Sequence, residues 1–111
     1  MFKIKYSPEA SNDLDRIGDY ISKDLQNPTA ALNTVNAIQD RIDKLKKFPN
    51  TGTLLSSIYE DIDLYDYRFV ICLNYLAFYR VVGKKVYIDR IFHEKQDYIS
   101  ILLGSKYTYE I

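Results

Sequence analysis

The chain has 111 residues and a mass of 13.0 kDa, which is enough for one domain with one hydrophobic core and too little for two. Its 47% hydrophobic and 27% charged residues are typical of a soluble globular protein, and no apolar run approaches the ~20 residues that a membrane helix needs. One cysteine and one histidine exclude a disulfide framework and the usual zinc spacings, so we expect no metal site and no cofactor.

The net charge is zero, but charge is distributed unevenly along the chain. Residues 1–66 hold 8 Lys/Arg and 11 Asp/Glu, whereas residues 67–111 hold 7 and 4. The second part therefore has a net charge of +3, which would suit a phosphate or an acidic protein segment. It also holds seven of the 11 tyrosines, and tyrosine is frequent at protein interfaces and where bases stack. We expect a binding surface in this part of the chain.

The first half predicts a short strand followed by a helical hairpin. Residues 2–6 alternate apolar and polar side chains, and they lack the long apolar core of a signal peptide, so we expect a cytoplasmic protein. Ser7-Pro8 and Asn27-Pro28 each have the pattern of a helix N-cap followed by a proline at the first helical position. Apolar residues then recur every three or four positions, so we expect one face of each helix to be buried, with Ala10, Leu14, Ile17, Ile21 and Leu25 in the first helix and Ala31, Val35, Ile38, Ile42 and Leu45 in the second.

The second half predicts three strands and a short helix. Residues 48–65 have the composition of an irregular surface connection, with a short strand near Leu54. Residues 67–73, 75–82 and 85–92 are rich in β-branched and aromatic side chains and are joined by short links, so they should pair as an antiparallel meander. Cys72, inside the first of these strands, is expected to be a small buried side chain.

A helix is predicted from Glu94 to Leu103, where Gly104 stops it, and residues 104–111 form a tail to a core of residues 2–103. The order β-α-α-β-β-β-α predicts an α+β domain in which the helical hairpin covers one face of an antiparallel sheet. The other face would be open, and we expect the functional site on that face and at the end of the last strand.

Two segments, YLAFYRV at residues 75–81 and RIFHEKQDY at residues 90–98, together with the order of elements, resemble the ParE/RelE superfamily of type II toxin–antitoxin toxins. Residues 92–98 are the most specific part, because they are similar to the hydrophobic-His-x-x-x-Asp-aromatic motif that ends the last strand of ParE-like members. The resemblance covers about residues 2–103. It implies a bacterial growth inhibitor that a cognate antitoxin neutralises, that has no membrane partner, and that contacts operator DNA only through the antitoxin.

Two activities occur in this superfamily. ParE-like members poison DNA gyrase, whereas RelE-like members cleave mRNA on the ribosome. Ribonuclease members usually place an arginine after the tyrosine that opens the middle strand of the meander, and this chain has Leu76 after Tyr75. The sequence therefore favours a gyrase poison, with an mRNA endoribonuclease as the alternative and a non-toxic interaction module as the second alternative.

Cleavage of RNA by its 2′-hydroxyl needs an acid, a base and a cation near the phosphate. If the chain is a ribonuclease, the candidate catalytic residues are Arg68, Arg80 and His93, although an arginine in an ion pair and a histidine at a helix start are the plainer alternatives.

Arg90 is a candidate for binding the target or the antitoxin. Alternation along its strand would place it on one face with Val86, Ile88 and Phe92. An arginine on a mostly apolar face suggests a bidentate partner, which would be a phosphate, an antitoxin carboxylate or an internal acid such as Asp97.

The remaining candidates for binding lie after the last strand and in the helices. Glu94 and Asp97 also suit the first turn of a helix, and Tyr98 also suits a core position. We expect an antitoxin helix to lie against the Leu14 and Ile38 side of the hairpin, or an antitoxin strand to add to the edge of the sheet.

Overall fold

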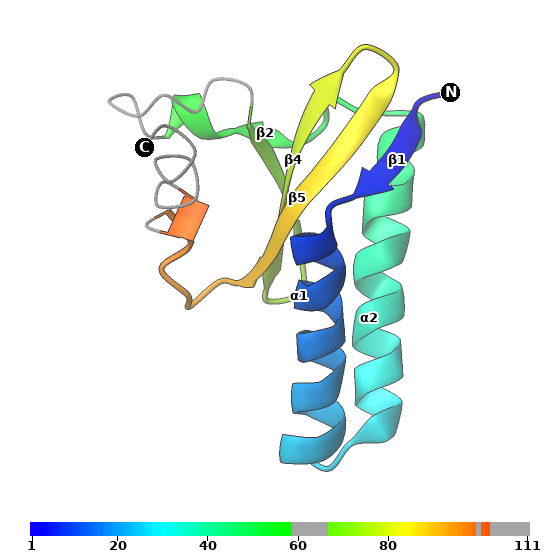
Figure 1. Ribbon diagram of the computed structural model, residues 1–111, viewed down its shortest axis with the longest axis vertical. Helices are drawn as coiled ribbons and strands as arrows, with labels where there is room; N and C mark the ends of the chain where they lie inside the picture. The colour runs from blue at the N-terminus through cyan, green and yellow to red at the C-terminus, as the bar shows by residue number, and fades with distance from the viewer. Residues whose placement is uncertain (59–66, 100, 103–111) are drawn as a thin grey trace.

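A helical hairpin packs on one face of a five-stranded sheet in the computed structural model, which describes residues 1–58, 67–99 and 101–102 (Figure 1). This arrangement is the α+β architecture that the sequence predicts. Within these ranges no helix is long and apolar enough to cross a membrane. Residues 59–65 of the predicted surface connection lie outside the described residues, as do the predicted helix end at Leu103 and the tail.

Helix α1 (Pro8–Asp19) begins where the sequence predicts. The Ser7 hydroxyl accepts a hydrogen bond from the Ala10 N–H at 2.9 Å, so it satisfies a backbone donor that has no partner inside the helix. The helix continues into a π-helical turn, η1 (Tyr20–Asp24). A π turn holds one more residue than an α turn, which changes the direction of the side chains that follow it.

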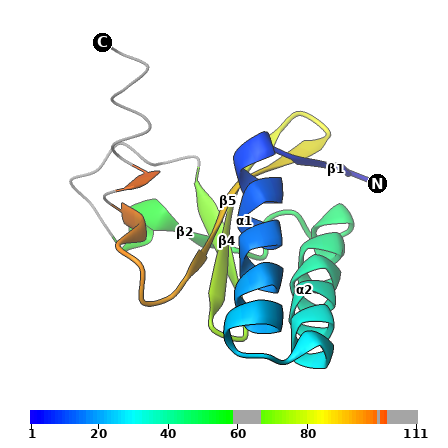
Figure 2. The ribbon, with the colours of Figure 1, turned by 60° about the horizontal axis from the view of Figure 1, so that its bottom comes forward.

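Helix α2 (Pro28–Asp43) also has its predicted cap, because the Asn27 side chain accepts from the Ala30 N–H at 3.0 Å. A 3-10 turn, η2 (Lys44–Lys46), ends it. Figure 2 shows α1 and α2 side by side, so the predicted hairpin is confirmed.

The sheet has the strand order β1-β5-β4-β3-β2. The strands are β1 (Lys3–Tyr6), β2 (Thr53–Leu54), β3 (Arg68–Cys72), β4 (Tyr75–Val82) and β5 (Lys85–His93). Strands β3, β4 and β5 form the predicted antiparallel meander, and β2 is the predicted short strand. Because β1 pairs with β5 in parallel, the sheet is mixed, so the prediction of a wholly antiparallel sheet is wrong at this edge.

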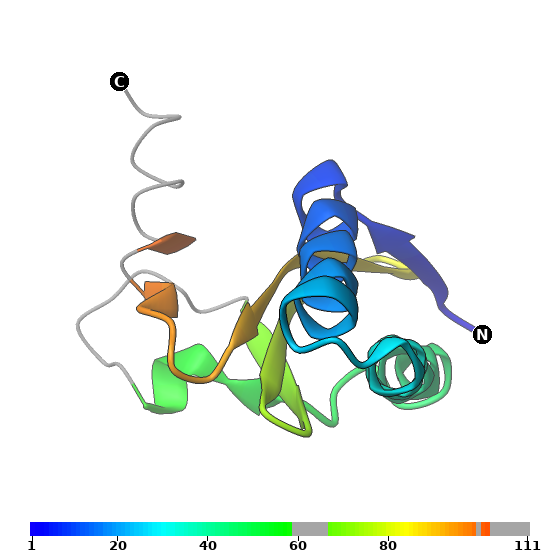
Figure 3. The same cartoon turned by 90° about the horizontal axis from the view of Figure 1, so that it is seen from below.

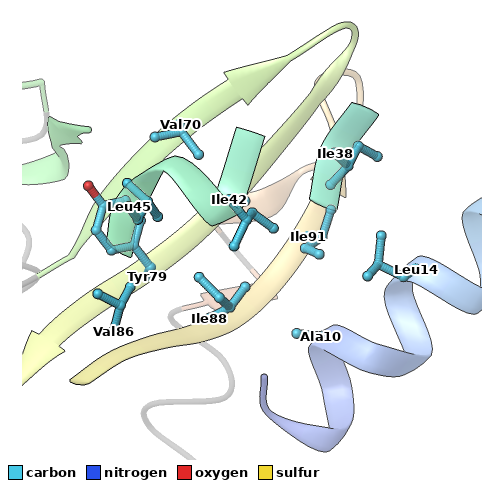
Figure 4. Packing of buried hydrophobic residues seen from close by; sticks show 11 residues of the cluster. Ala10, Leu14, Ile38, Ile42, Leu45, Val70, Tyr79, Val86, Ile88 and Ile91 are labelled. Carbon is cyan, nitrogen blue, oxygen red and sulfur yellow. The ribbon is translucent and has the colours of Figure 1, made fainter. Parts of the chain in front are cut away.

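The main core lies between the hairpin and the sheet (Figure 4). Its buried members, which we call the helix-side core, are Ala10, Leu14, Ile38, Ile42, Leu45, Val70, Ala77, Tyr79, Val86, Ile88 and Ile91. Cys72 is only half-buried against this core, and burial raises the pKa of its thiol. The prediction that Leu25 continues the buried face of the first helix is wrong, because this side chain follows the π turn and is 57% exposed.

The opposite face of the sheet is not fully open, so that prediction is wrong in part. Leu76, Phe78 and Phe92 project from this face and need an apolar cover. The 3-10 turn η3 (Leu55–Ser57) and the short helix near Leu102 supply it, and Figure 3 shows both on the side of the sheet away from α1 and α2.

A β-bulge changes which side chains of β5 share a face. Phe78 lies opposite Arg90, but the next residue of β4, Tyr79, lies opposite Ile88, so Asp89 is an extra residue in β5. Ile88 belongs to the helix-side core, whereas Phe92 belongs to the cluster on the other face. The predicted shared face of Val86, Ile88, Arg90 and Phe92 is therefore wrong.

The helix after β5 begins at Tyr98 and not at Glu94. Strand β5 extends to His93, and residues 94–96 form a turn in which the Gln96 N–H donates to the His93 carbonyl oxygen at 3.0 Å. The first helical bond runs from the Ile101 N–H to the Asp97 carbonyl oxygen at 3.2 Å. The Gln96 side chain also accepts from the His93 N–H, and this local pairing competes with a helix at Glu94.

Candidate protein-binding site

A groove of about 910 Å³ lies between the C-terminal part of the first helix and the end of the meander. The helices extend beyond the strands at this end of the molecule (Figure 1). One wall is made by α1 and η1, with Arg16, Ile17 and Tyr20, and the other by the β3–β4 turn and the residues after β5, with Leu73 and Lys95.

Both walls expose large apolar side chains. Tyr20 and Leu25 on the helical wall and Leu73 on the facing wall are 52%, 57% and 61% exposed. Leu73 has a φ of 56°, a left-handed conformation that costs a leucine about 1 kcal/mol. Strained backbone and π turns are frequent at functional sites, and here they occur on the two walls of one groove.

The base of the groove holds a buried ion pair. Asp13 is 6% exposed and accepts from the Arg90 Nε at 2.9 Å, from its Nη2 at 3.1 Å and from the Ile91 N–H at 2.8 Å. The bidentate partner predicted for Arg90 is therefore an internal acid, Asp13. Because α1 lies beside β5 after β1 has ended, Asp13 satisfies a strand-edge donor that would otherwise have no partner.

His93 organises the rim of the groove. Its ring packs edge-on against Tyr75, with the ring centroids 5.2 Å apart. Its Nδ1 accepts from the Lys95 N–H at 3.1 Å, and its own N–H donates to the Gln96 Oε1 at 2.8 Å. His93 thus fixes the turn that carries Lys95 into the groove lining.

Arg80 lies on the sheet face opposite the helices, within a group of aromatic and acidic side chains. Its Nε and Nη2 donate to the two carboxylate oxygens of Asp89 at 2.7 and 3.4 Å. Its guanidinium carbon is 5.8 Å from the ring centroid of Tyr67 and 5.9 Å from that of Tyr87. The Tyr67 hydroxyl donates to Asp89 at 2.8 Å, and burial together with that carboxylate raises the pKa of Tyr67 to about 12.

Arg68 lies on the helix side of the sheet, opposite Tyr79 in the register. Its Nη1 donates to the carbonyl oxygens of Asn50 at 3.2 Å and Gly52 at 2.9 Å. Tyr79 holds the same loop, because its hydroxyl accepts from the Gly52 N–H at 2.9 Å and donates to the Pro49 carbonyl oxygen at 2.7 Å. Both side chains therefore fix the segment that leads into β2.

The three residues predicted for ribonuclease catalysis do not come together. Arg68 and Arg80 project from opposite faces of the sheet, because Arg68 pairs with Tyr79 and side chains alternate along β4. His93 lies six residues along β5 from Tyr87, the partner of Arg80, which places it roughly 20 Å away.

Of the residues predicted after β5, Glu94 is exposed in the turn, and its N–H donates to the Asn74 carbonyl oxygen at 2.8 Å. Asp97 is exposed at the start of the short helix. The Tyr98 ring lies 5.3 Å from that of Phe78, so it packs in the second core.

Leu14 and Ile38, predicted to contact an antitoxin, are 7% and 1% exposed in the helix-side core and present little surface to a partner.

Sequence reasoning missed Tyr20 and Leu73. The two-residue link between β3 and β4 could have indicated Leu73, because such links usually need a positive φ. The periodicity of the first helix gives no warning of a π turn, so Tyr20 had no comparable signal. Within the described part of the chain, no group of three His, Cys, Asp or Glu side chains could hold a metal ion.

Comparison with known proteins defines the family. Residues 4–98 match the family model described as the ParE toxin of the type II toxin–antitoxin system parDE, so the chain belongs to the ParE toxin family. A comparison with curated proteins gave no match.

Two solved structures are similar to the chain. One is described as the chromosomal ParDE toxin–antitoxin system from P. aeruginosa, with 27% identity, a TM-score of 0.69, and coverage of 84% of this chain and 96% of that one. The other is YafQ from E. coli strain BL21(DE3), with 16% identity, a TM-score of 0.51, and coverage of 85% and 94%. At that identity, the likeness to YafQ concerns the fold alone.

Proposed function

We propose that this ParE-family toxin inhibits bacterial growth by binding DNA gyrase and that it does not cleave RNA. The observation that carries the proposal is the separation of Arg68, Arg80 and His93, which lie on two faces and at a distant end of the sheet. An acid, a base and a cation must all reach one phosphate for RNA cleavage. The likeness to the ParDE structure supports the same conclusion.

The partners of the two arginines give further support. The charge of Arg80 is balanced by Asp89 in a bidentate pair, and Arg68 holds backbone carbonyl oxygens of the loop before β2. Each arginine therefore has a structural role in the folded chain, which is the alternative to a catalytic role that the sequence analysis gives. An inhibitor that acts by binding a protein needs no acid–base pair.

The test compares two readouts after the chain is produced alone. Purified gyrase, supercoiled plasmid and the toxin are incubated together, with gyrase alone as the control, and we expect loss of supercoiling activity or trapped cleaved plasmid. In cells, the 5′ ends of mRNA are mapped a few minutes after induction. New ends within translated codons, with gyrase unaffected, would refute the proposal in favour of a ribonuclease, and normal growth would leave the non-toxic interaction module.

The groove is the surface that we propose for the antitoxin. Its exposed apolar side chains, Tyr20, Leu25 and Leu73, lie near the exposed cations Arg16 and Lys95. A segment that alternates apolar and acidic side chains would bury the exposed apolar side chains of the groove and pair with its cations. This surface replaces the one expected around Leu14 and Ile38.

The replacement Leu73→Asn tests the groove, because asparagine tolerates a left-handed backbone better than leucine does. We expect the free energy of unfolding to stay the same or rise. Affinity for the product of the neighbouring gene should fall by about 10- to 100-fold, since burial of a leucine contributes about 1.5–3 kcal/mol. Leu32→Asn, at a 63% exposed leucine of α2 that does not line the groove, is the matched control. Equal affinity for both variants would exclude this docking site.

A further inference from the structure

One end of the sheet carries a regular array of lysines on the face away from the helices. In the register, Lys5 of β1, Tyr87 of β5 and Arg80 of β4 form one row across the sheet. Lys3, Lys85 and Val82 form the next row. We call the surface made by Lys3, Lys5, Arg80, Lys85 and Tyr87 the lysine face.

The neighbours of these residues show on which side of the sheet the lysine face lies. Ile4, Tyr6 and Val81 pack against the helix-side core, to which Val86 and Ile88 belong. Because side chains alternate along a strand, the residues between them project to the other side of the sheet.

The three lysines are exposed, and Tyr87 is half-buried. The acid on this part of the face is Asp89, which pairs with Arg80, so the described residues of this face have a net charge of about +3.

We propose that the lysine face binds single-stranded nucleic acid, with the lysines on successive phosphates and a base stacked on Tyr87, and that it does so without cleavage. Residues two apart on a strand are about 6.6 Å apart and neighbouring strands about 4.8 Å apart, so the cations form a grid that can follow a phosphodiester backbone. Tyr87 lies between Lys5 and Arg80 in its row, and Lys85 is two residues away on the same strand, which places an aromatic ring beside the lysines. This combination is typical of surfaces that bind single strands.

Two further features favour nucleic acid. Arg80 is already held by Asp89 and by the rings of Tyr67 and Tyr87, so little side-chain entropy would be lost on binding. The helical layer has the opposite charge, since α1 and η1 contain the acids Glu9, Asp13, Asp15, Asp19 and Asp24 against two cations. A polyanion would therefore approach the molecule from the lysine side.

The test measures the anisotropy of a fluorescent thymidine oligonucleotide of about 20 nucleotides, which exceeds the usual site size of ~4–16 nucleotides, as the full chain is added at several salt concentrations. It requires neither gyrase nor antitoxin, so its outcome is independent of the proposed function. We expect salt-dependent binding. In the variant Lys3→Gln/Lys5→Gln/Lys85→Gln, the slope of log K against log salt should fall by about 2, at roughly 0.7 for each lost phosphate contact.

The matched control is Lys23→Gln/Lys44→Gln/Lys47→Gln, which removes the same charge from exposed lysines of the helical layer. We expect it to keep the slope of the natural chain. Circular dichroism establishes that both variants fold. Absence of binding at low salt, or an equal loss of slope in both triple variants, would overturn the proposal.

Replacement of Tyr87 distinguishes binding of a nucleic acid from binding of an acidic protein segment. Stacking predicts that Tyr87→Ala lowers affinity for the oligonucleotide by about 5- to 150-fold and that Tyr87→Phe retains it. Polyglutamate of matched charge should compete weakly. If Tyr87→Ala binds as well as the natural chain, or if polyglutamate displaces the oligonucleotide as efficiently as unlabelled oligonucleotide does, the lysine face would instead be a site for acidic protein segments.

Discussion

Replacing Tyr79 with phenylalanine tests how the loop before β2 is held in place. The side chain is fully buried, and its hydroxyl bridges the Gly52 N–H at 2.9 Å and the Pro49 carbonyl oxygen at 2.7 Å. Phenylalanine keeps the ring, so no large cavity forms. The change leaves two buried backbone groups without their partner.

The expected cost follows from those two bonds. A buried donor or acceptor that loses its partner costs about 1–3 kcal/mol. Because the Gly52 N–H and the Pro49 carbonyl oxygen belong to one loop and can relax together, their combined cost should be about 2–3 kcal/mol. Urea denaturation followed by circular dichroism should show this loss with an unchanged m-value, because the surface exposed on unfolding is the same. The melting temperature should fall by roughly 8–12 °C in a domain of this size.

Tyr20→Phe is the control, since that side chain is 52% exposed, and it should change the free energy of unfolding by less than ~0.5 kcal/mol. A double-mutant cycle with Arg68→Gln should be non-additive, because Arg68 holds the same loop through Asn50 and Gly52. A loss below ~0.5 kcal/mol for Tyr79→Phe would refute the reasoning.

Three other predictions concern stability. Asp13→Asn removes the buried pair with Arg90 and should cost about 2–3 kcal/mol in urea denaturation, less than a fully buried pair would, because Arg90 is 20% exposed. Gly52→Ala should cost about 1–3 kcal/mol, since a Cβ there would lie 2.8 Å from a backbone carbonyl oxygen, and an unchanged midpoint would contradict this packing. Burial, and then Asp89, raise the pKa of Tyr67 to about 12, so the contribution of this hydroxyl to the free energy of unfolding should be complete below pH ~10 and lost as pH rises toward 12. Tyr67→Phe should lack this part of the alkaline loss of stability, and its phenolate-absorbance titration should lack the group that ionises near pH 12.

The helices and the meander were predictable because their signals are local. Ser7 and Asn27 each precede a proline and cap a helix, and the side-chain oxygen of each makes the predicted bond. The bulge at Asp89 has no local signal, because it depends on how β4 and β5 fit together after both have twisted. Simple alternation along the strand therefore predicted that Phe92 and Ile88 share a face, whereas they lie on opposite faces of the sheet.

Single candidate residues were predictable, but their roles were not. Sequence reasoning named an internal acid as one partner for Arg90, yet the acid is Asp13, 77 residues away. The groove depends on a π turn at Tyr20 and on the strained link at Leu73, which arise from tertiary packing and not from residue preference. A surface built from three distant segments leaves no pattern within any one of them.

The pairing of the first strand with the last one constrains synthesis of the toxin. Lys3 of β1 lies beside Lys85 of β5, and the Ser7 hydroxyl donates to the Asp89 carbonyl oxygen across 82 residues. Neither β1 nor the sheet-facing side of α1 has its partner until β5 has left the ribosome, so native pairing is delayed until that strand has been translated. A ribosome that stops before residue 85 would release a fragment without this pairing, and production of folded toxin therefore requires translation through β5.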